Sequence, residues 1–233
     1  MLTRDALLAS LARDQAAFFE LMRDADLTAP VPDCPGWTLA DLGGHLGSVH
    51  GWARGAVETG APPDEPVPPA DPSRLPDWYA DQAAALLDTL LTTPSGTECW
   101  TFGPRPRTVD FWVRRQPHET AMHLRDARRA SGVDRPIEPA LAADGVDEVV
   151  TMFVPRQIRL ERIAPLDTGV RLVATDVEAG PWLLGGDGSA HAATVTGSAE
   201  SLLLWLWRRD GHDLAVEGDA TAVAAAHAVA LTP

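Results

Sequence analysis

The chain has 233 residues, enough for one large domain or two small ones. Its net charge of −14 leaves no basic face to neutralise phosphates, which argues against nucleic-acid binding. The sequence has no apolar run of the roughly 18 residues that a membrane span needs and no secretory leader. Its two cysteines, Cys34 and Cys99, provide no disulfide framework. We therefore expect a cytoplasmic protein that binds neither nucleic acid nor membrane.

Helical spacing of apolar residues dominates the first 131 residues. Thr3 is the expected N-cap of the first helix, and Thr38 with Asp41 forms a short capping box for the second. The expected helices span residues 3–26, 38–59, 77–92 and 109–131. The proline-rich residues 60–76 are expected to be an extended surface connection. Four helices of this length form a bundle, and bundles build metal sites between facing helices.

From about residue 140 the pattern changes to alternating and β-branched runs. The expected strands cover residues 157–163, 170–177, 181–184, 192–196 and 214–218. The expected helices of this half cover residues 144–154, 198–209 and 220–230. This half is predicted to be a small α+β domain with mostly antiparallel strands. The predicted fold class is therefore a two-domain α+β chain, with a four-helix bundle over 1–140 and an α+β domain over 141–233.

Glu119 and His123 lie four residues apart on the fourth predicted helix. Side chains at this spacing lie one above the other, about 6 Å apart, so the carboxylate and the imidazole can bind one metal ion. Both fall inside the apolar stripe that contains Trp112 and Met122, where ionisable groups are costly unless paired or ligated. The same pair on a surface is an ordinary helix pair worth a few tenths of a kcal/mol. A metal site therefore needs a third ligand.

His45 is the candidate third ligand, because it lies within the apolar stripe of the second predicted helix. A lone histidine there is more often a hydrogen-bonded core residue than a ligand, and His50 is a weaker candidate. With Glu119 and His123 it makes a set of two imidazoles and one carboxylate. Three protein ligands and an open position are typical of catalytic zinc. Iron(II) and nickel(II) accept the same set.

Other chemistry-bearing residues are secondary. His118 is not expected to bind the metal, whereas Arg125 and Asp126 are candidates for orienting a ligand or contacting substrate charge. The chain has no glycine-rich phosphate loop, no serine nucleophile elbow and no His-Glu-x-x-His motif. Neither Cys34 nor Cys99 has an obviously activating setting, so we do not expect a protein thiol as nucleophile.

Two long segments resemble those of a known family. Residues 31–46 read VPDCPGWTLADLGGHL and residues 114–127 read RRQPHETAMHLRDA. They resemble the signature turn with the second helix, and the fourth-helix motif, of the mycothiol-dependent maleylpyruvate isomerase family in the DinB-like superfamily. Residues 204–209 (LWLWRR) and 214–219 (LAVEGD) are similar to its C-terminal domain. The resemblance implies a DinB-like metal-binding bundle followed by a sterol-carrier-like α+β domain.

The resemblance also implies roles for particular residues. The family's metal ligands fall on His45, Glu119 and His123, and its catalytic arginine falls on Arg209. The family has a glycine before that arginine, whereas this chain has Arg208. The implied cofactors are mycothiol and a divalent metal, with zinc expected first and nickel or iron next.

The implied mechanism is nucleophilic attack by an external thiol. A divalent cation favours the thiolate, which adds to an electrophilic small substrate. An isomerase releases the thiolate after rotation about the former double bond, whereas a transferase leaves it attached. Arg209 would hold a substrate carboxylate through paired N–H donors.

Two other functions fit the same residues. One is a metal-dependent hydrolase in which water is the nucleophile, and thiol-dependent turnover separates it from the first reading. The other is a non-catalytic module that binds a small molecule, which binding by metal-free protein would favour. The fold names neither the substrate nor the oligomeric state.

Overall fold

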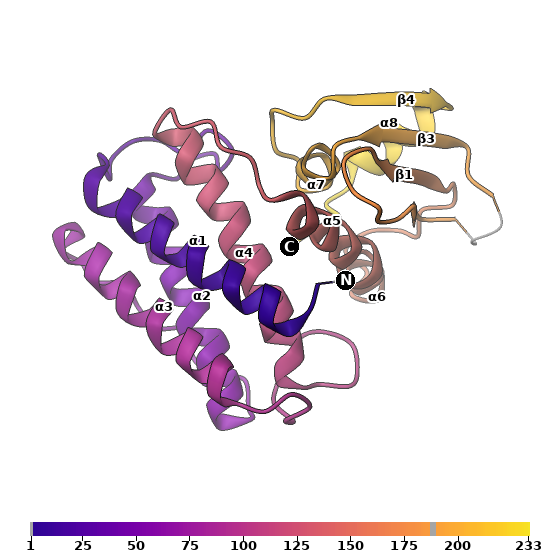
Figure 1. Cartoon of the computed structure of the whole chain (residues 1–233). Coiled ribbons are helices and arrows are strands. Elements are labelled where there is room, and N and C mark those ends of the chain that lie inside the picture. Colours follow the sequence, from indigo (N-terminus) through magenta and orange to yellow (C-terminus); the bar gives the residue numbers. More distant parts are fainter. Residues whose placement is uncertain (1, 187–189) are drawn as a thin grey trace. The chain divides into compact units, whose positions relative to one another are not determined.

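The computed structural model describes residues 2–186 and 190–233, which divide into two compact units, 2–136 and 137–233. The first unit is helical, and the second combines helices with a four-stranded sheet (Figure 1). The predicted α+β fold class is confirmed. Among the described helices, none combines the length and the apolar character that crossing a bilayer requires.

Four long helices build the first unit, as predicted. They are α1 (Arg4–Asp24), α2 (Leu39–Thr59), α3 (Leu75–Thr92) and α4 (Val109–Ala130), with a short 3-10 turn, η1 (Pro72–Arg74), before α3. The Thr3 side chain accepts a hydrogen bond from the Ala6 backbone N–H, so it caps α1. Thr38 and Asp41 form the expected reciprocal capping box at the start of α2. Local sequence therefore determines where these helices begin.

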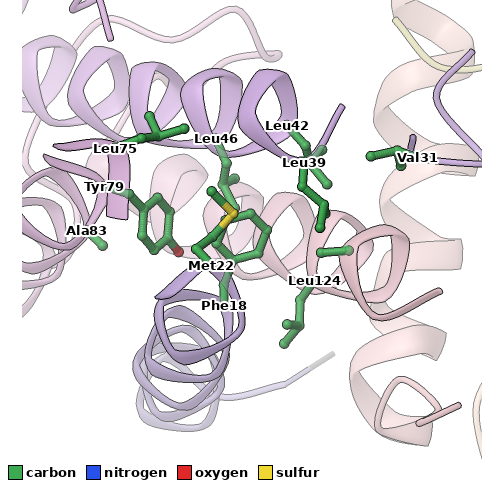
Figure 2. Packing of buried hydrophobic residues seen from close by; sticks show 11 residues of the cluster. Phe18, Met22, Val31, Leu39, Leu42, Leu46, Leu75, Tyr79, Ala83 and Leu124 are labelled. Atoms are coloured by element: carbon green, nitrogen blue, oxygen red, sulfur yellow. The ribbon is translucent and has the colours of Figure 1, made fainter. Parts of the chain in front are cut away.

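The core of the bundle is a cluster of apolar side chains from all four helices. Figure 2 shows Phe18 and Met22 of α1 between Tyr79 of α3 and Leu124 of α4. Fully burying one such side chain contributes about 1.5–3 kcal/mol. Gly43 of α2 lets α1 come close, because a Cβ there would lie only 2.4 Å from the Met22 Cε atom.

A proline strap, residues 61–70, connects α2 to the turn before α3. Its prolines lie over glycines of α2. A Cβ added at Gly51 would lie 2.4 Å from the Pro66 Cγ atom, and one at Gly44 would lie 3.3 Å from the Pro68 Cγ atom. Glycines on this face of α2 therefore provide room for the proline rings of the strap.

The second unit begins with a helical segment and continues into a mixed sheet. The helical segment comprises α5 (Pro139–Glu148), the π-helical stretch η2 (Val149–Phe153) and α6 (Val154–Arg159). The later elements are β1 (Val170–Ala174), β2 (Trp182–Leu184), β3 (Ala193–Gly197), α7 (Ala199–Leu206), β4 (Leu214–Gly218) and α8 (Ala220–Ala228). The strand order is β2-β1-β3-β4, in which β1 and β3 are parallel and both outer pairs are antiparallel. Helices α7 and α8 contact β1 and β3.

The predicted strand over 157–163 is wrong. Residues up to Arg159 are helical, since α6 continues from η2, and residues 160–163 form a turn. Pro155 lies at the junction where the π-helical stretch η2 passes into α6, and the helical segment continues through it. The buried residues Val154 and Gln157 are three apart, which is the helical period. The Gln157 side chain donates a hydrogen bond to the Thr232 carbonyl at 2.8 Å, and this bond allows the polar side chain to be buried.

The turn after α7 keeps its geometry although Arg208 stands where the resemblance expects glycine. Arg208 has a φ of 56°. Its N–H donates to the Trp205 carbonyl, and the Arg209 N–H donates to the Leu204 carbonyl at 2.8 Å. This pair of bonds is the Schellman motif, in which glycine usually takes the left-handed position. Arg208 therefore adopts the backbone conformation of the glycine that it replaces.

Arg208→Gly is expected to raise the free energy of unfolding by about 0.5–1 kcal/mol. The left-handed conformation costs a non-glycine residue about 1–2 kcal/mol, and the substitution removes this cost. Glycine has more conformational entropy in the unfolded chain, which lowers the gain in stability by about 0.5–1 kcal/mol. Urea unfolding followed by circular dichroism measures the difference. Arg159→Gly is the matched control, because Arg159 lies in the last turn of α6 and glycine there should destabilise. Equal destabilisation by both substitutions would contradict the strain argument.

Candidate metal centre

Helices α2 and α4 bring the three predicted ligands together. His45 Nε2 lies 3.3 Å from Glu119 Oε1, and His123 Nε2 lies 3.3 Å from the same oxygen. One ligand atom from each of the three residues lies within 4.8 Å of the other two. The i, i+4 spacing of Glu119 and His123 on α4 provides two of these donors, and packing of α2 against α4 adds the third. Their role as metal ligands stays a prediction.

The centre is mostly buried and carries a strong local charge pattern. The side chains of Glu119 and His123 are 14% and 8% exposed, whereas that of His45 is 34% exposed. Arg115, one turn before Glu119, donates to its Oε2 at 2.5 Å. Burial raises the pKa of the Glu119 carboxyl, but the charge of Arg115 and the hydrogen bond to His123 outweigh it and hold this pKa well below its usual range. Glu119 is therefore an ionised, oriented carboxylate.

His123 is held from its other ring nitrogen as well. Its Nδ1 lies 3.3 Å from Oδ2 of the fully buried Asp126, and the Cys34 thiol donates to the same oxygen at 3.5 Å. Burial lowers the pKa of His123, but the hydrogen bonds with Asp126 and Cys34 outweigh it and raise this pKa well above its usual range.

This arrangement fits a bound divalent cation. The raised pKa makes His123 an imidazolium while no cation is bound, and a cation would bind Nε2 by replacing the proton on that nitrogen. Asp126 would then accept from the remaining Nδ1–H, which is the usual outer contact of a metal-binding histidine. Cys34, His123 and Asp126 also lie close enough to share an ion themselves. Asp126 and Cys34 are candidate outer partners, because His123 Nε2 lies toward Glu119 and Nδ1 lies toward Asp126. The nitrogen, oxygen and nitrogen donors of His45, Glu119 and His123 suit zinc, nickel or iron(II).

The turn before α2 contacts both histidines. The Asp33 carboxylate accepts from Arg125 at 2.5 Å and lies 3.3 Å from Arg129, so two arginines of α4 hold this turn. The ring centroid of Trp37 lies 5.0 Å from that of His45, edge to face. The signature turn therefore does more than connect α1 to α2, because it supports His45 through Trp37 and His123 through Cys34 and Asp126.

Some neighbours of the site differ from those that the sequence predicts. His50 and His118 belong to neither of the groups close enough to share an ion, among the described residues. His50 instead bonds Gln116, with Nδ1 2.8 Å from Oε1. Arg115 was missed, although its i, i+4 spacing to Glu119 is a readable signal. The setting of Cys34 had no such signal, because its contact with α4 spans 92 residues of sequence.

Asp126→Ala is expected to lower zinc affinity by about 10–100-fold, the usual cost of removing an outer partner of a metal ligand. Asp126→Asn should retain part of the affinity, because its amide oxygen can still accept from Nδ1–H. Competition with a chromogenic zinc chelator measures both values. Unchanged affinity in Asp126→Ala would contradict the outer-partner role. Two zinc ions per chain, one of them lost in Cys34→Ser, would show that Cys34 and Asp126 are ligands themselves.

Arg209 lies in the second unit, directly after the left-handed Arg208. Its backbone is held by the Schellman turn, so departure from the glycine pattern leaves the turn intact. Its assignment as a catalytic residue stays a prediction.

Comparison with known proteins follows the same two-part division. The family model described as the mycothiol maleylpyruvate isomerase N-terminal domain matches residues 8–128, and the model of the corresponding C-terminal domain matches residues 140–225. A search of curated proteins finds no match.

Two crystal structures share the fold over most of the chain. One is of the mycothiol-dependent maleylpyruvate isomerase, with a TM-score of 0.64 at 12% identity. The other is of a histidine-to-alanine mutant of an enzyme with that name, with a TM-score of 0.68 at 13% identity. Each likeness covers 94% of this chain and 95% of the other. With more than half of its length matched by the N-terminal model alone, the chain belongs to the mycothiol maleylpyruvate isomerase family.

Proposed function

We propose that this chain is a metal-dependent enzyme that uses mycothiol as the nucleophile toward a small, electrophilic substrate that carries a carboxylate. Isomerisation of maleylpyruvate, the reaction in the names of its family and of the two crystallised proteins, is the first reaction to test. The observation that carries the proposal is the convergence of His45, Glu119 and His123 around one position. Burying ionisable groups such as Glu119 and His123 costs free energy unless they are paired or ligated. Binding of a cation would offset that cost.

We propose a separate role for each residue of the site. His45, Glu119 and His123 would hold a divalent cation, which favours the thiolate form of a small thiol at neutral pH. Arg115 keeps Glu119 ionised and fixes its orientation. Asp126 keeps the Nδ1 proton of His123 in place, so that Nε2 remains the binding atom.

The substrate is proposed to be held by an arginine. Arg209 would bind its carboxylate through paired N–H donors, which match the geometry of that group. The thiolate then adds to the activated double bond, the resulting single bond rotates, and expulsion of the same thiolate restores the double bond. The thiol is regenerated, so an isomerisation of this kind needs no oxidant, reductant or second substrate.

The test is turnover of maleylpyruvate by purified, zinc-loaded protein with and without mycothiol. Thiol-dependent conversion to the trans isomer supports the proposal, and Arg209→Gln should then raise the KM for maleylpyruvate while zinc content stays unchanged. Turnover of ester or amide substrates without any thiol would favour a hydrolase instead. Protein that binds no divalent metal after reconstitution would overturn the proposal.

A further inference from the structure

A groove of about 610 Å³ opens beside His45 within the first unit. Its walls are the turn before α2, the first turns of α2 and the proline strap, with Trp37 and Pro68 among the residues that line it. This volume falls in the range of about 300–1,000 Å³ typical of small-molecule sites. His45 is in the wall and is the most exposed of the three candidate ligands. The groove therefore leads to the edge of the candidate metal centre.

The groove is lined by acidic side chains, which determines the kind of ligand it can bind. Asp41 and Glu65 line it, and no arginine is among the described residues that do. The Thr38 backbone N–H and hydroxyl both donate to Asp41 and lower the pKa of its carboxyl, so this group stays ionised. Two carboxylates disfavour an anionic ligand and can only accept hydrogen bonds at neutral pH. A neutral molecule rich in hydroxyl groups fits this wall, and a dicarboxylate does not.

The proline strap and an aromatic side chain form two sides of the groove. The Ser48 hydroxyl donates to the Pro66 carbonyl at 2.7 Å, which ties the proline strap to α2. Pro66 lies against Gly51, so the strap has little room to move inward. The indole of Trp37 lines the groove and packs on the His45 ring. A wall that is ordered before binding lowers the entropic cost of holding a flexible ligand.

We propose that this groove holds the hydroxyl-bearing body of mycothiol, with its thiol at the His45 end, and that the anionic substrate binds outside it. The inference rests on the proposed function and names which ligand of that reaction the groove takes. Glu65, an exposed residue of the proline strap, becomes a specificity residue for the thiol. It contributes an acceptor for the hydroxyl groups of the thiol, whereas Asp41 also lines the groove and keeps it negatively charged when Glu65 is replaced.

The test compares Glu65→Gln with Asp64→Asn in zinc-loaded protein. Asp64 is the matched control, since it is the adjacent exposed carboxylate of the strap and does not line the groove. Calorimetric titration measures the affinity for mycothiol and for ethanethiol, which has a thiol but no hydroxyl group. Glu65→Gln should weaken mycothiol binding about 5–10-fold, as expected for losing hydrogen bonds to a charged acceptor. Ethanethiol affinity and the KM for maleylpyruvate should not change, and Asp64→Asn should match the wild type.

Three other results of these measurements would contradict the inference. Equal mycothiol affinity in Glu65→Gln and wild type would overturn the assignment of the groove while leaving a thiol-dependent enzyme in place. A changed KM for maleylpyruvate with unchanged mycothiol affinity would assign the groove to the substrate and overturn the inference. Failure of both mycothiol and ethanethiol to bind zinc-loaded wild type would overturn the proposed function, and the inference with it.

Discussion

His45→Ala is expected to lower zinc affinity by more than about 100-fold and to abolish thiol-dependent turnover. Loss of an outer partner already costs about 10–100-fold in metal affinity, and loss of a ligand must exceed it. The substitution leaves Glu119 and His123 on α4, and two ligands with i, i+4 spacing are an ordinary helix pair. Elemental analysis by mass spectrometry, after dialysis against a weak chelator, measures the zinc retained per chain.

The control for this substitution is His191→Ala, which removes an exposed histidine of the second unit. It should retain zinc and activity. His45→Ala should also unfold at nearly the same urea concentration as wild type when both are metal-free, because His45 is partly exposed. Full zinc content in His45→Ala would reject the three-residue centre. Loss of zinc accompanied by loss of the helical circular dichroism signal would show a folding defect instead.

The second large effect is a loss of stability on acidification that originates at His50. This side chain is fully buried in α2, and burial lowers its pKa to about 4, although the hydrogen bond with Gln116 acts in the opposite direction. Between pH 6.5 and about 4 the unfolded chain therefore binds a proton that the folded chain does not. Stability falls as pH decreases through this window, by about 1.4 kcal/mol per pH unit and about 3 kcal/mol in total.

His50→Gln should remove this part of the pH dependence, because glutamine does not titrate. Urea unfolding of wild type and variant at pH 7.0, 6.0, 5.0 and 4.5, in the presence of a chelator, measures the difference between the two slopes. The chelator removes metal release as a second source of acid sensitivity. His191→Gln is the control and should keep the wild-type slope. Parallel slopes for His50→Gln and wild type would show that His50 is protonated in the folded chain.

Much of the fold and part of the site could be read from the sequence, where the signal is local. The capping box of Thr38 and Asp41 lies within four residues, and the Glu119 and His123 pair within five. Both depend only on helix geometry, which a short sequence determines. The strand predicted over 157–163 is wrong because the helical segment continues through Pro155 to Arg159. That proline follows a π-helical stretch, which apolar periodicity does not indicate.

The sequence by itself determined the helical half, the sheet-containing half and the residue types able to bind a metal. Only the tertiary structure decided that Arg125 and Arg129 hold Asp33, that Cys34 meets Asp126, and that the proline strap lies over the glycines of α2. These contacts join segments far apart in the chain, and no periodicity within one element encodes them. The surroundings of the metal centre and the groove beside it are therefore products of packing, whereas the candidate ligands themselves are visible in helical spacing and residue type.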